Sequence, residues 1–264
     1  MNGKLGLNQG GYAGEKIDIE QVVQRALLAA ASHGWSADRF SPDGCPSIYA
    51  LRRGPTDAEA RVYISAGIHG DEPAGPCAVV ELIEEDRFPE QFSYWICPCL
   101  NPWGCESNRR ENPQGIDLNR DYHRPVASEV QSHIAWLEVQ PRFDVAFCLH
   151  EDWESDGFYI YELNLDSRPS LAEGMIDAVS MVCPVDLASE IEGRPAVGGI
   201  IRPNHDPLSR PQWPEAFYLT QKKTRQSYTL EAPSDFPLSV RVAALKAATS
   251  EALRKLGQWG VVRS

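Results

Sequence analysis

Short apolar runs alternate with helical patterns along this chain, and this alternation limits its possible folds more than any other feature. The runs at 61–67, 93–99, 144–149 and 227–231 are typical of buried strands. Residues 74–85 lie between two of them and are expected to form a helix that Pro73 opens. Strands separated by helices imply a sheet with helices on both faces. We therefore predict a single-domain, three-layer α/β/α fold with a mixed, largely parallel central sheet.

The other predicted elements complete this picture. Further strands are expected at 46–52 and 157–163, with helices near 17–33, 127–139, 170–181 and 237–257. Residues 201–214 are rich in proline and arginine and predict a long loop, of the kind that often covers a binding site. The glycine-rich residues 1–14 are expected to be mobile. A chain of 264 residues is long enough to bury one substantial α/β core.

Two strand ends carry side chains that are suited to binding a metal ion. His69-Gly-Asp-Glu72 closes the apolar run 62–68, and His150 closes the run 144–149. Two imidazoles and one carboxylate are the three protein ligands of many zinc sites that keep a fourth position open. Because functional residues of such folds gather at the carboxyl ends of strands, these side chains are expected to meet. Taken alone, a His-x-x-Glu pattern is more often a surface turn.

The cysteines offer no competing metal site. Cys97 and Cys99 are separated by one residue, whereas thiolate zinc sites use a spacing of at least two. The seven cysteines lie mostly in apolar contexts, which favours reduced thiols in a core over a disulfide framework.

Charge and hydropathy exclude several classes of function. The net charge of −12 argues against a nucleic-acid-binding protein. The sequence contains neither an apolar stretch of membrane-spanning length nor a secretory leader, so we expect a cytoplasmic protein that does not contact membranes. Nothing in the sequence predicts its oligomeric state.

The segment between the two histidines resembles the zinc carboxypeptidase family. Its motifs are Asn101-Pro-Trp-Gly104, Arg110-Glu-Asn112 and Gly115-Ile-Asp-Leu-Asn-Arg120, and a fourth family element is Ser227-Tyr-Thr-Leu-Glu231. Trp103 stands where the family has Asp, and Asp121 stands where it has Asn. The resemblance covers roughly residues 61–235 and is strongest over 65–122.

The resemblance implies a role for each polar group of the site. His69, Glu72 and His150 would bind one zinc ion per chain, and Asp117 would accept a hydrogen bond from His69. Glu231 would act as the general base on a zinc-activated water. Arg110, favoured over Arg109 by its spacing from Asn119, would stabilise the oxyanion. Asn119 and Arg120 would bind the free carboxylate of the substrate, and Tyr218 is the first candidate for the family's substrate-contacting tyrosine, ahead of Tyr228.

Each role has a structural alternative. Arg109 and Arg110 could be solvated charges, Asp117 could cap a turn, and Glu231 could be an ordinary strand-end acid. Tyr228 fits a buried strand position better than a substrate contact. The remaining histidines are interpreted as non-ligands: His33, His123, His133 and His205.

The predicted function is that of a zinc-dependent metallocarboxypeptidase. Its expected partner is a small peptide or N-acyl amino acid with a free carboxylate. One alternative is an N-acyl amino acid deacylase of the aspartoacylase and succinylglutamate desuccinylase branch, which shares the main motifs. The other is a metal-binding homologue without catalytic activity.

Overall fold

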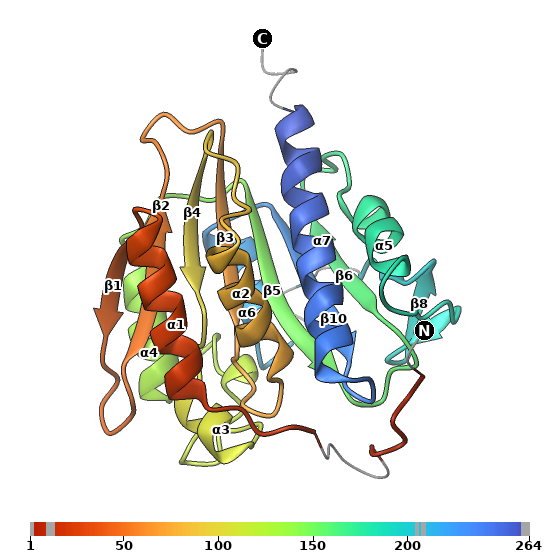
Figure 1. Cartoon of the computed structure of the whole chain (residues 1–264), viewed down its shortest axis with the longest axis horizontal. Helices are drawn as coiled ribbons and strands as arrows, with labels where there is room; N and C mark the ends of the chain where they lie inside the picture. The colour runs from red at the N-terminus through yellow and green to blue at the C-terminus, as the bar shows by residue number, and fades with distance from the viewer. Residues whose placement is uncertain (1–2, 9–13, 204–205, 207–209, 260–264) are drawn as a thin grey trace.

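A computed structural model describes residues 3–8, 14–203, 206 and 210–259 of the chain. A mixed sheet forms the centre of the molecule (Figure 1). Within these residues, ten strands follow the order β1-β2-β4-β3-β5-β10-β6-β9-β8-β7. Their bounds are β1 Ser36–Phe40, β2 Ile48–Arg53, β3 Ala60–Ala66, β4 Phe92–Cys97, β5 Val145–Asp152, β6 Tyr159–Asn164, β7 Glu190–Ile191, β8 Arg194–Val197, β9 Ile200–Ile201 and β10 Gln226–Pro233.

Helices connect β3 to β4, β4 to β5, β6 to β7 and β9 to β10, and others lie before β1 and after β10. They are α1 Ile19–Ser32, α2 Ala74–Glu84, α3 Pro102–Ser107, the short 3-10 helix η1 Leu118–Arg120, α4 Ser128–Glu138, α5 Ala172–Ser180, α6 Glu215–Lys222 and α7 Leu238–Trp259. No described helix combines the length and the apolarity that a membrane span needs.

The middle of the sheet is parallel, and all flanking pairs except β6 with β9 are antiparallel. β4, β3, β5 and β10 pair in parallel, while β1, β2 and β6 join this centre in antiparallel fashion. All but one of the residues of β3 are buried, as expected for a strand covered on both faces. The predicted mixed sheet is thus confirmed, with parallel pairing concentrated in its centre.

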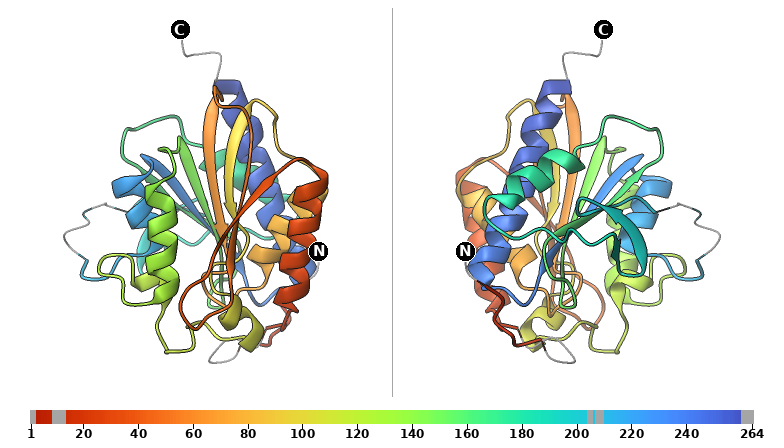
Figure 2. Two further views of the ribbon diagram at one scale, coloured as in Figure 1. Left: turned by 90° about the vertical axis from the view of Figure 1, so that its left-hand side faces the viewer. Right: turned by 90° about the vertical axis from the view of Figure 1, so that its right-hand side faces the viewer.

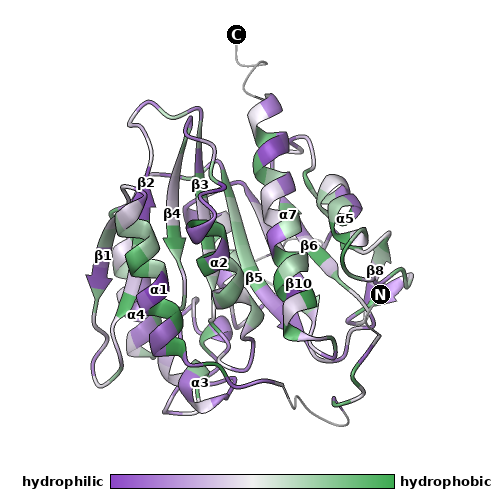
Figure 3. Ribbon diagram, viewed as in Figure 1, coloured by the Kyte–Doolittle hydropathy of each residue, from purple (hydrophilic) through white to green (hydrophobic). Residues whose placement is uncertain are grey.

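Helices cover both faces of this sheet, as Figure 2 shows. α1, α2, α5 and α7 lie on one face, and the buried apolar side chains beneath them form one core cluster. α4 and α6 lie on the opposite face above a second cluster. Figure 3 shows hydrophobic residues on α2 and along much of β5. Burial of apolar surface on both faces is therefore what holds the central strands in place.

Most elements match their predicted positions, and the exceptions have physical causes. β1 was not predicted, because this edge strand has few apolar residues and most of its side chains are exposed. β7, β8 and β9 are too short to leave a periodic pattern. Parts of the predicted mobile segment 1–14 and of the predicted loop 201–214 lie outside the described residues.

Candidate metal centre and active site

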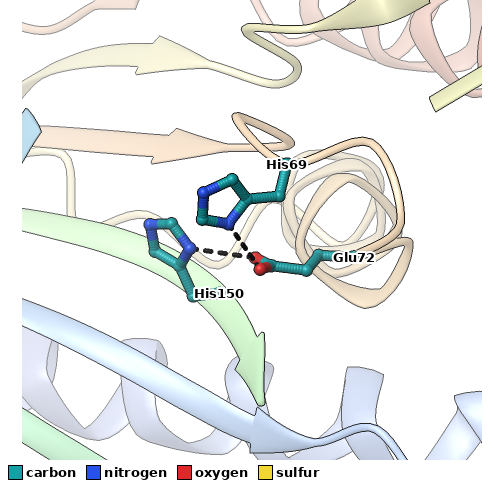
Figure 4. Close-up of side chains that lie close together, drawn as sticks. All are labelled: His69, Glu72 and His150. Atoms are coloured by element: carbon teal, nitrogen blue, oxygen red, sulfur yellow. Dashed lines mark hydrogen bonds and ion pairs between the residues drawn. The ribbon is translucent and has the colours of Figure 1, made fainter. Parts of the chain in front are cut away.

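Three buried side chains converge near the carboxyl ends of β3 and β5. His69 lies in the loop after β3, Glu72 lies just before α2, and His150 lies on β5. Their side chains point toward one another, as Figure 4 shows. The Nδ1 atoms of His69 and His150 lie 2.5 and 2.9 Å from the two carboxylate oxygens of Glu72. The three potential ligand atoms lie within 4.8 Å of one another, a spacing that a single metal ion can bridge.

Close backbone packing determines the conformation of the loop that carries His69. A Cβ atom on Gly70 would lie 1.9 Å from the carbonyl carbon of Gly104, so only glycine fits there. The Asn101 side chain caps α3 by accepting a hydrogen bond from Gly104 N, and its amide group donates to the carbonyl of Ile68 at 3.3 Å. The Asn101–Gly104 motif therefore supports the loop that carries His69.

Asp117 orients the His69 ring from the other side. Its Oδ1 atom lies 3.1 Å from Nε2 of His69 and also accepts a hydrogen bond from the backbone of Asn119. Because a carboxylate can only accept, Nε2 holds a proton toward Asp117, and in the neutral ring Nδ1 then has the lone pair that a metal ion beside Glu72 would bind. This tautomer is the one that binds a metal through Nδ1.

The charges of the site shift several pKa values. Burial lowers the pKa of His69, but Glu72 and Asp117 outweigh it and raise that pKa to about 9. Burial alone would raise the pKa of Glu72, yet the nearby rings of His69 and His150 hold that pKa well below its ordinary value. The pKa of Asp117 is also lowered, because the hydrogen bond from His69 and the charge of Arg110 outweigh the effect of its burial. Anionic carboxylates beside imidazoles are what a divalent cation requires.

Arg110, rather than Arg109, lies at this cluster. Its Nε atom donates to Asp117 at 3.0 Å, and its guanidinium lies 3.6 Å from Glu72. The guanidinium of Arg109 instead lies over the Trp103 ring, 5.9 Å from its centroid. The spacing argument thus selected the arginine that reaches the cluster.

Glu231 lies beside His150 on the neighbouring strand. The two residues are paired in the parallel register of β10 and β5, so their side chains leave the same face of the sheet. Burial raises the pKa of Glu231 to about 8, against the lowering effect of His150. A carboxyl group with a pKa near neutrality is suited to accept and return a proton.

The cluster opens into a cavity of about 560 Å³. Asn119 and Arg120 line it together with Arg110 and Glu231. The side-chain oxygen of Asn119 accepts a hydrogen bond from the backbone of Glu215 at 2.8 Å. Its amide NH2 is therefore the end that can donate to an anion.

Tyr218 is not among the residues that line the cavity, so its predicted contact with the substrate stays a prediction that this geometry does not support. Tyr218 is buried, and its ring packs against Tyr122 at a centroid distance of 5.8 Å. The rotation of α6 places Ala216 and Phe217 in the cavity lining instead. Tyr228 is fully buried on β10, as its strand pattern predicted.

The tyrosines that do line the cavity are Tyr159 and Tyr161 on β6. They pair in register with Glu231 and Thr229, so they share the cavity face of the sheet. The hydroxyl of Tyr159 donates to Asp152 at 3.1 Å. The alternating pattern of the predicted strand 157–163 was a usable signal for this pair.

Arg194 and Arg210 also line the cavity and were not predicted. Arg194 begins β8, and the guanidinium of Arg210 lies 5.0 Å from the centroid of the Phe217 ring. Burial together with the charges of Arg194 and Arg120 lowers the pKa of Arg210. No local motif indicated either residue, because both reach the cavity from irregular or very short elements.

The remaining polar residues of the motifs have structural contacts. The carboxylate of Asp121 accepts hydrogen bonds from the backbone of Val126 and Ala127, which accounts for its presence where the family has Asn. Among the described residues, His69, Glu72 and His150 form the one group with metal-ligand geometry. Thus His33, His123 and His133 lie outside it, and His205 lies outside the described residues.

Comparison with known proteins gives one family and several related structures. Residues 58–165 match the catalytic-domain model of the succinylglutamate desuccinylase/aspartoacylase family. Murein peptide amidase A of Escherichia coli is 31% identical over 108 residues, which are 39% of this chain and 41% of that protein. The match therefore spans less than half of the amidase.

Solved structures share the fold over nearly the whole chain. A candidate metallopeptidase from Shewanella amazonensis has a TM-score of 0.79 and 22% identity, with 90% of this chain and 93% of that one covered. A metallo-carboxypeptidase from Burkholderia cenocepacia has a TM-score of 0.66 and 19% identity, with 90% and 69% covered. These likenesses show that the chain shares the fold of both solved structures.

Proposed function

We propose that this chain is a zinc-dependent metallocarboxypeptidase, which hydrolyses an amide bond next to a free carboxylate. The observation that carries the proposal is the convergence of His69, Glu72 and His150 beside Glu231 at one cavity. The family match over residues 58–165 supports a hydrolase of the metallopeptidase or amidase type. The whole chain would act as one catalytic domain with one zinc ion.

The donor set fits zinc. His69 and His150 present imidazole nitrogens, Glu72 presents a carboxylate oxygen, and Asp117 fixes the tautomer of His69. A zinc ion held there would supply Lewis acidity, which polarises a carbonyl group and makes a water molecule more acidic.

Glu231 is assigned the proton transfers. It would accept a proton from the attacking water and return it to the leaving amine. The raised pKa of Glu231 supports this role, because a stronger base takes the proton more readily and a carboxyl near neutrality also gives it up.

Three residues are assigned to the substrate. Arg110 would stabilise the negative charge that develops on the carbonyl oxygen. Arg120 and the NH2 group of Asn119 would bind the free carboxylate, since a guanidinium can hold a carboxylate through two parallel hydrogen bonds. Both residues line the same cavity as Glu231, which supports this division of roles.

A second candidate is an N-acyl amino acid deacylase. It is favoured by the match of residues 58–165 to the succinylglutamate desuccinylase/aspartoacylase catalytic domain. The likeness to the amidase also brings short peptides of the cell-wall type into consideration as substrates. A metal-binding homologue without activity would bind zinc and hydrolyse neither class of compound.

A substrate screen tests these alternatives. Zinc-loaded protein is incubated with a panel of peptides and N-acyl amino acids, and release of the free amino acid is measured. The best compound is then compared with its carboxyl amide. Loss of a charge-assisted contact in a dry site costs roughly 2 to 5 kcal/mol, or some thirtyfold to several thousandfold in rate.

The Arg120→Ala variant is the matched control on the protein side. It should retain zinc and hydrolyse the free acid and its amide at similar, low rates. Equal hydrolysis of the two compounds by the wild-type protein would refute the carboxypeptidase assignment.

A further inference from the structure

A buried carboxylate lies directly behind the cavity wall. Glu215 is the first residue of α6 and is 1% exposed. Its two carboxylate oxygens accept hydrogen bonds from the hydroxyl groups of Tyr63 and Ser65, both at 2.8 Å. Among the described residues, no lysine or arginine forms an ion pair with Glu215. Burying a carboxylate without a cation is costly, so the hydroxyl donors and the amino end of α6 must offset this cost.

The charge of Glu215 sets the direction of a longer hydrogen-bond chain. Because a carboxylate only accepts, the Tyr63 hydroxyl donates to it and must itself accept from Nε2 of His133, at 2.9 Å. Nδ1 of His133 then accepts from the hydroxyl of Tyr122, at 2.7 Å. This arrangement requires a neutral His133 ring, and burial lowers the pKa of His133 to about 3. Every donor in the chain has an acceptor, so the chain forms a single, satisfied network.

Glu215 also contacts the candidate site through its backbone. Its N–H group donates to the side-chain oxygen of Asn119 at 2.8 Å, which turns the NH2 group of Asn119 to the opposite side. The backbone of Asn119 donates to Asp117, the acid that orients His69. The next residues of α6 line the cavity. One residue thus ties β3, η1 and the α6 wall together.

We propose that Glu215 is a positioning residue for substrate binding, which fixes the Asn119 amide and the α6 wall against β3. This inference rests on the proposed function, in which Asn119 binds the free carboxylate of the substrate. Glu215 does not line the cavity, so it would act through Asn119 and not by contact with the substrate. Its loss should therefore weaken substrate binding and leave the metal ligands and Glu231 largely in place.

The test is a double-mutant cycle with Glu215→Gln and Asn119→Ala. The glutamine is nearly isosteric, but it can no longer accept from both hydroxyl groups through ionised oxygens. A displacement near 1 Å costs up to about a hundredfold in such sites, so we expect KM to rise about tenfold or more in Glu215→Gln with kcat within about threefold. If Glu215 acts through Asn119, the double variant should have the KM of Asn119→Ala alone.

Matched variants separate positioning from simple destabilisation. Glu129→Gln makes the same change at another buried glutamate, which bonds to Asn112 and lies outside the cavity lining. It should leave KM unchanged even if its melting temperature falls. Ser65→Ala removes one donor to Glu215 and should raise KM in the same direction by a smaller factor, in case Glu215→Gln folds poorly.

A binding measurement keeps this inference separate from the proposed activity. Calorimetric titration with N-acetyl-L-phenylalanine, in a Glu231→Gln background, reports the same cycle without turnover. Binding without hydrolysis of any panel compound would refute the proposed function, while non-additive losses of affinity would still support Glu215. Additive effects of Glu215→Gln and Asn119→Ala, or no loss in Glu215→Gln, would overturn the inference. Absence of binding to the Glu231→Gln protein that carries no other substitution would overturn both.

Discussion

The buried ion pair between Arg241 and Glu151 gives the sharpest prediction about stability. Both side chains are fully buried, and Arg241 on α7 donates through Nη1 to Glu151 at the end of β5. Glu151 also accepts from the backbone N–H of Ala74 at 2.6 Å, at the start of α2. The pair therefore joins α7, β5 and α2 directly behind His150. We predict that Arg241→Met strongly destabilises the protein.

The size of this effect follows from burial. Removing one partner of a buried ion pair costs about 3 to 5 kcal/mol, because the other charge remains in a dry interior. Arg241 also pairs with Glu15, which is 42% exposed, so that contact adds little. Arg25→Met is the control, since its pair with Glu84 lies at the surface and should contribute at most about 1 kcal/mol.

The loss in the free energy of unfolding caused by Arg241→Met should increase with pH. Burial raises the pKa of Glu151 to about 7, and Arg241 opposes that rise. Without Arg241 the pKa of folded Glu151 rises further, whereas the unfolded chain keeps its ordinary value. A raised folded-state pKa gives stability that is present at low pH and lost as pH increases. The deficit of Arg241→Met should therefore be larger near about pH 8 than near about pH 5, by roughly 1 kcal/mol, because pH 8 lies about one unit above the wild-type pKa of Glu151.

Urea denaturation followed by tryptophan fluorescence measures both quantities. The expected result is a loss of about 3 to 5 kcal/mol in the free energy of unfolding at the higher pH. Two results would contradict the prediction that Arg241 pairs with an ionised Glu151. One is a loss in the free energy of unfolding below about 1 kcal/mol at the higher pH, and the other is a loss of equal size at both pH values.

Three further predictions concern the site and the core. Purified protein should bind about one zinc ion per chain, and His150→Ala should lose most of it, as measured by atomic emission; full retention would exclude His150 as a ligand. Glu231→Gln should keep the zinc ion and lose at least about a hundredfold in turnover, because an amide cannot accept the proton; a near wild-type rate would assign the base elsewhere. Burial lowers the pKa of His133 from 6.5 to about 3. The free energy of unfolding should therefore decrease as pH falls from 6.5 toward about 3, because the unfolded chain binds a proton that the folded protein does not. His133→Gln should flatten the pH dependence of urea denaturation across this range, and an unchanged slope would contradict the buried neutral ring.

The architecture and the members of the candidate metal site could be predicted from the amino-acid sequence. Apolar runs and helical spacing located the central strands and most of the helices, because a doubly covered sheet requires both patterns. His69 and Glu72 are close in the sequence, and His150 ends a neighbouring parallel strand, so the strand-end rule was enough to bring them together. Asp117 and Arg110 followed from the resemblance to the family's motifs, and both reach the cluster. The catalytic and binding roles of these residues stay predictions.

The side chains of the cavity wall and of the buried networks could not be identified before the packing of the layers was known. Tyr218 turned into the core and Phe217 into the cavity, since a rotation of α6 about its axis depends on packing against β5 and β10. Tyr161, Arg194 and Arg210 meet there from three separate segments, and the pairs Arg241–Glu151 and Glu215–Tyr63 join residues far apart in the chain. Periodicity and spacing describe local geometry, whereas such contacts arise from strand register and helix rotation, which are fixed only when the layers pack together.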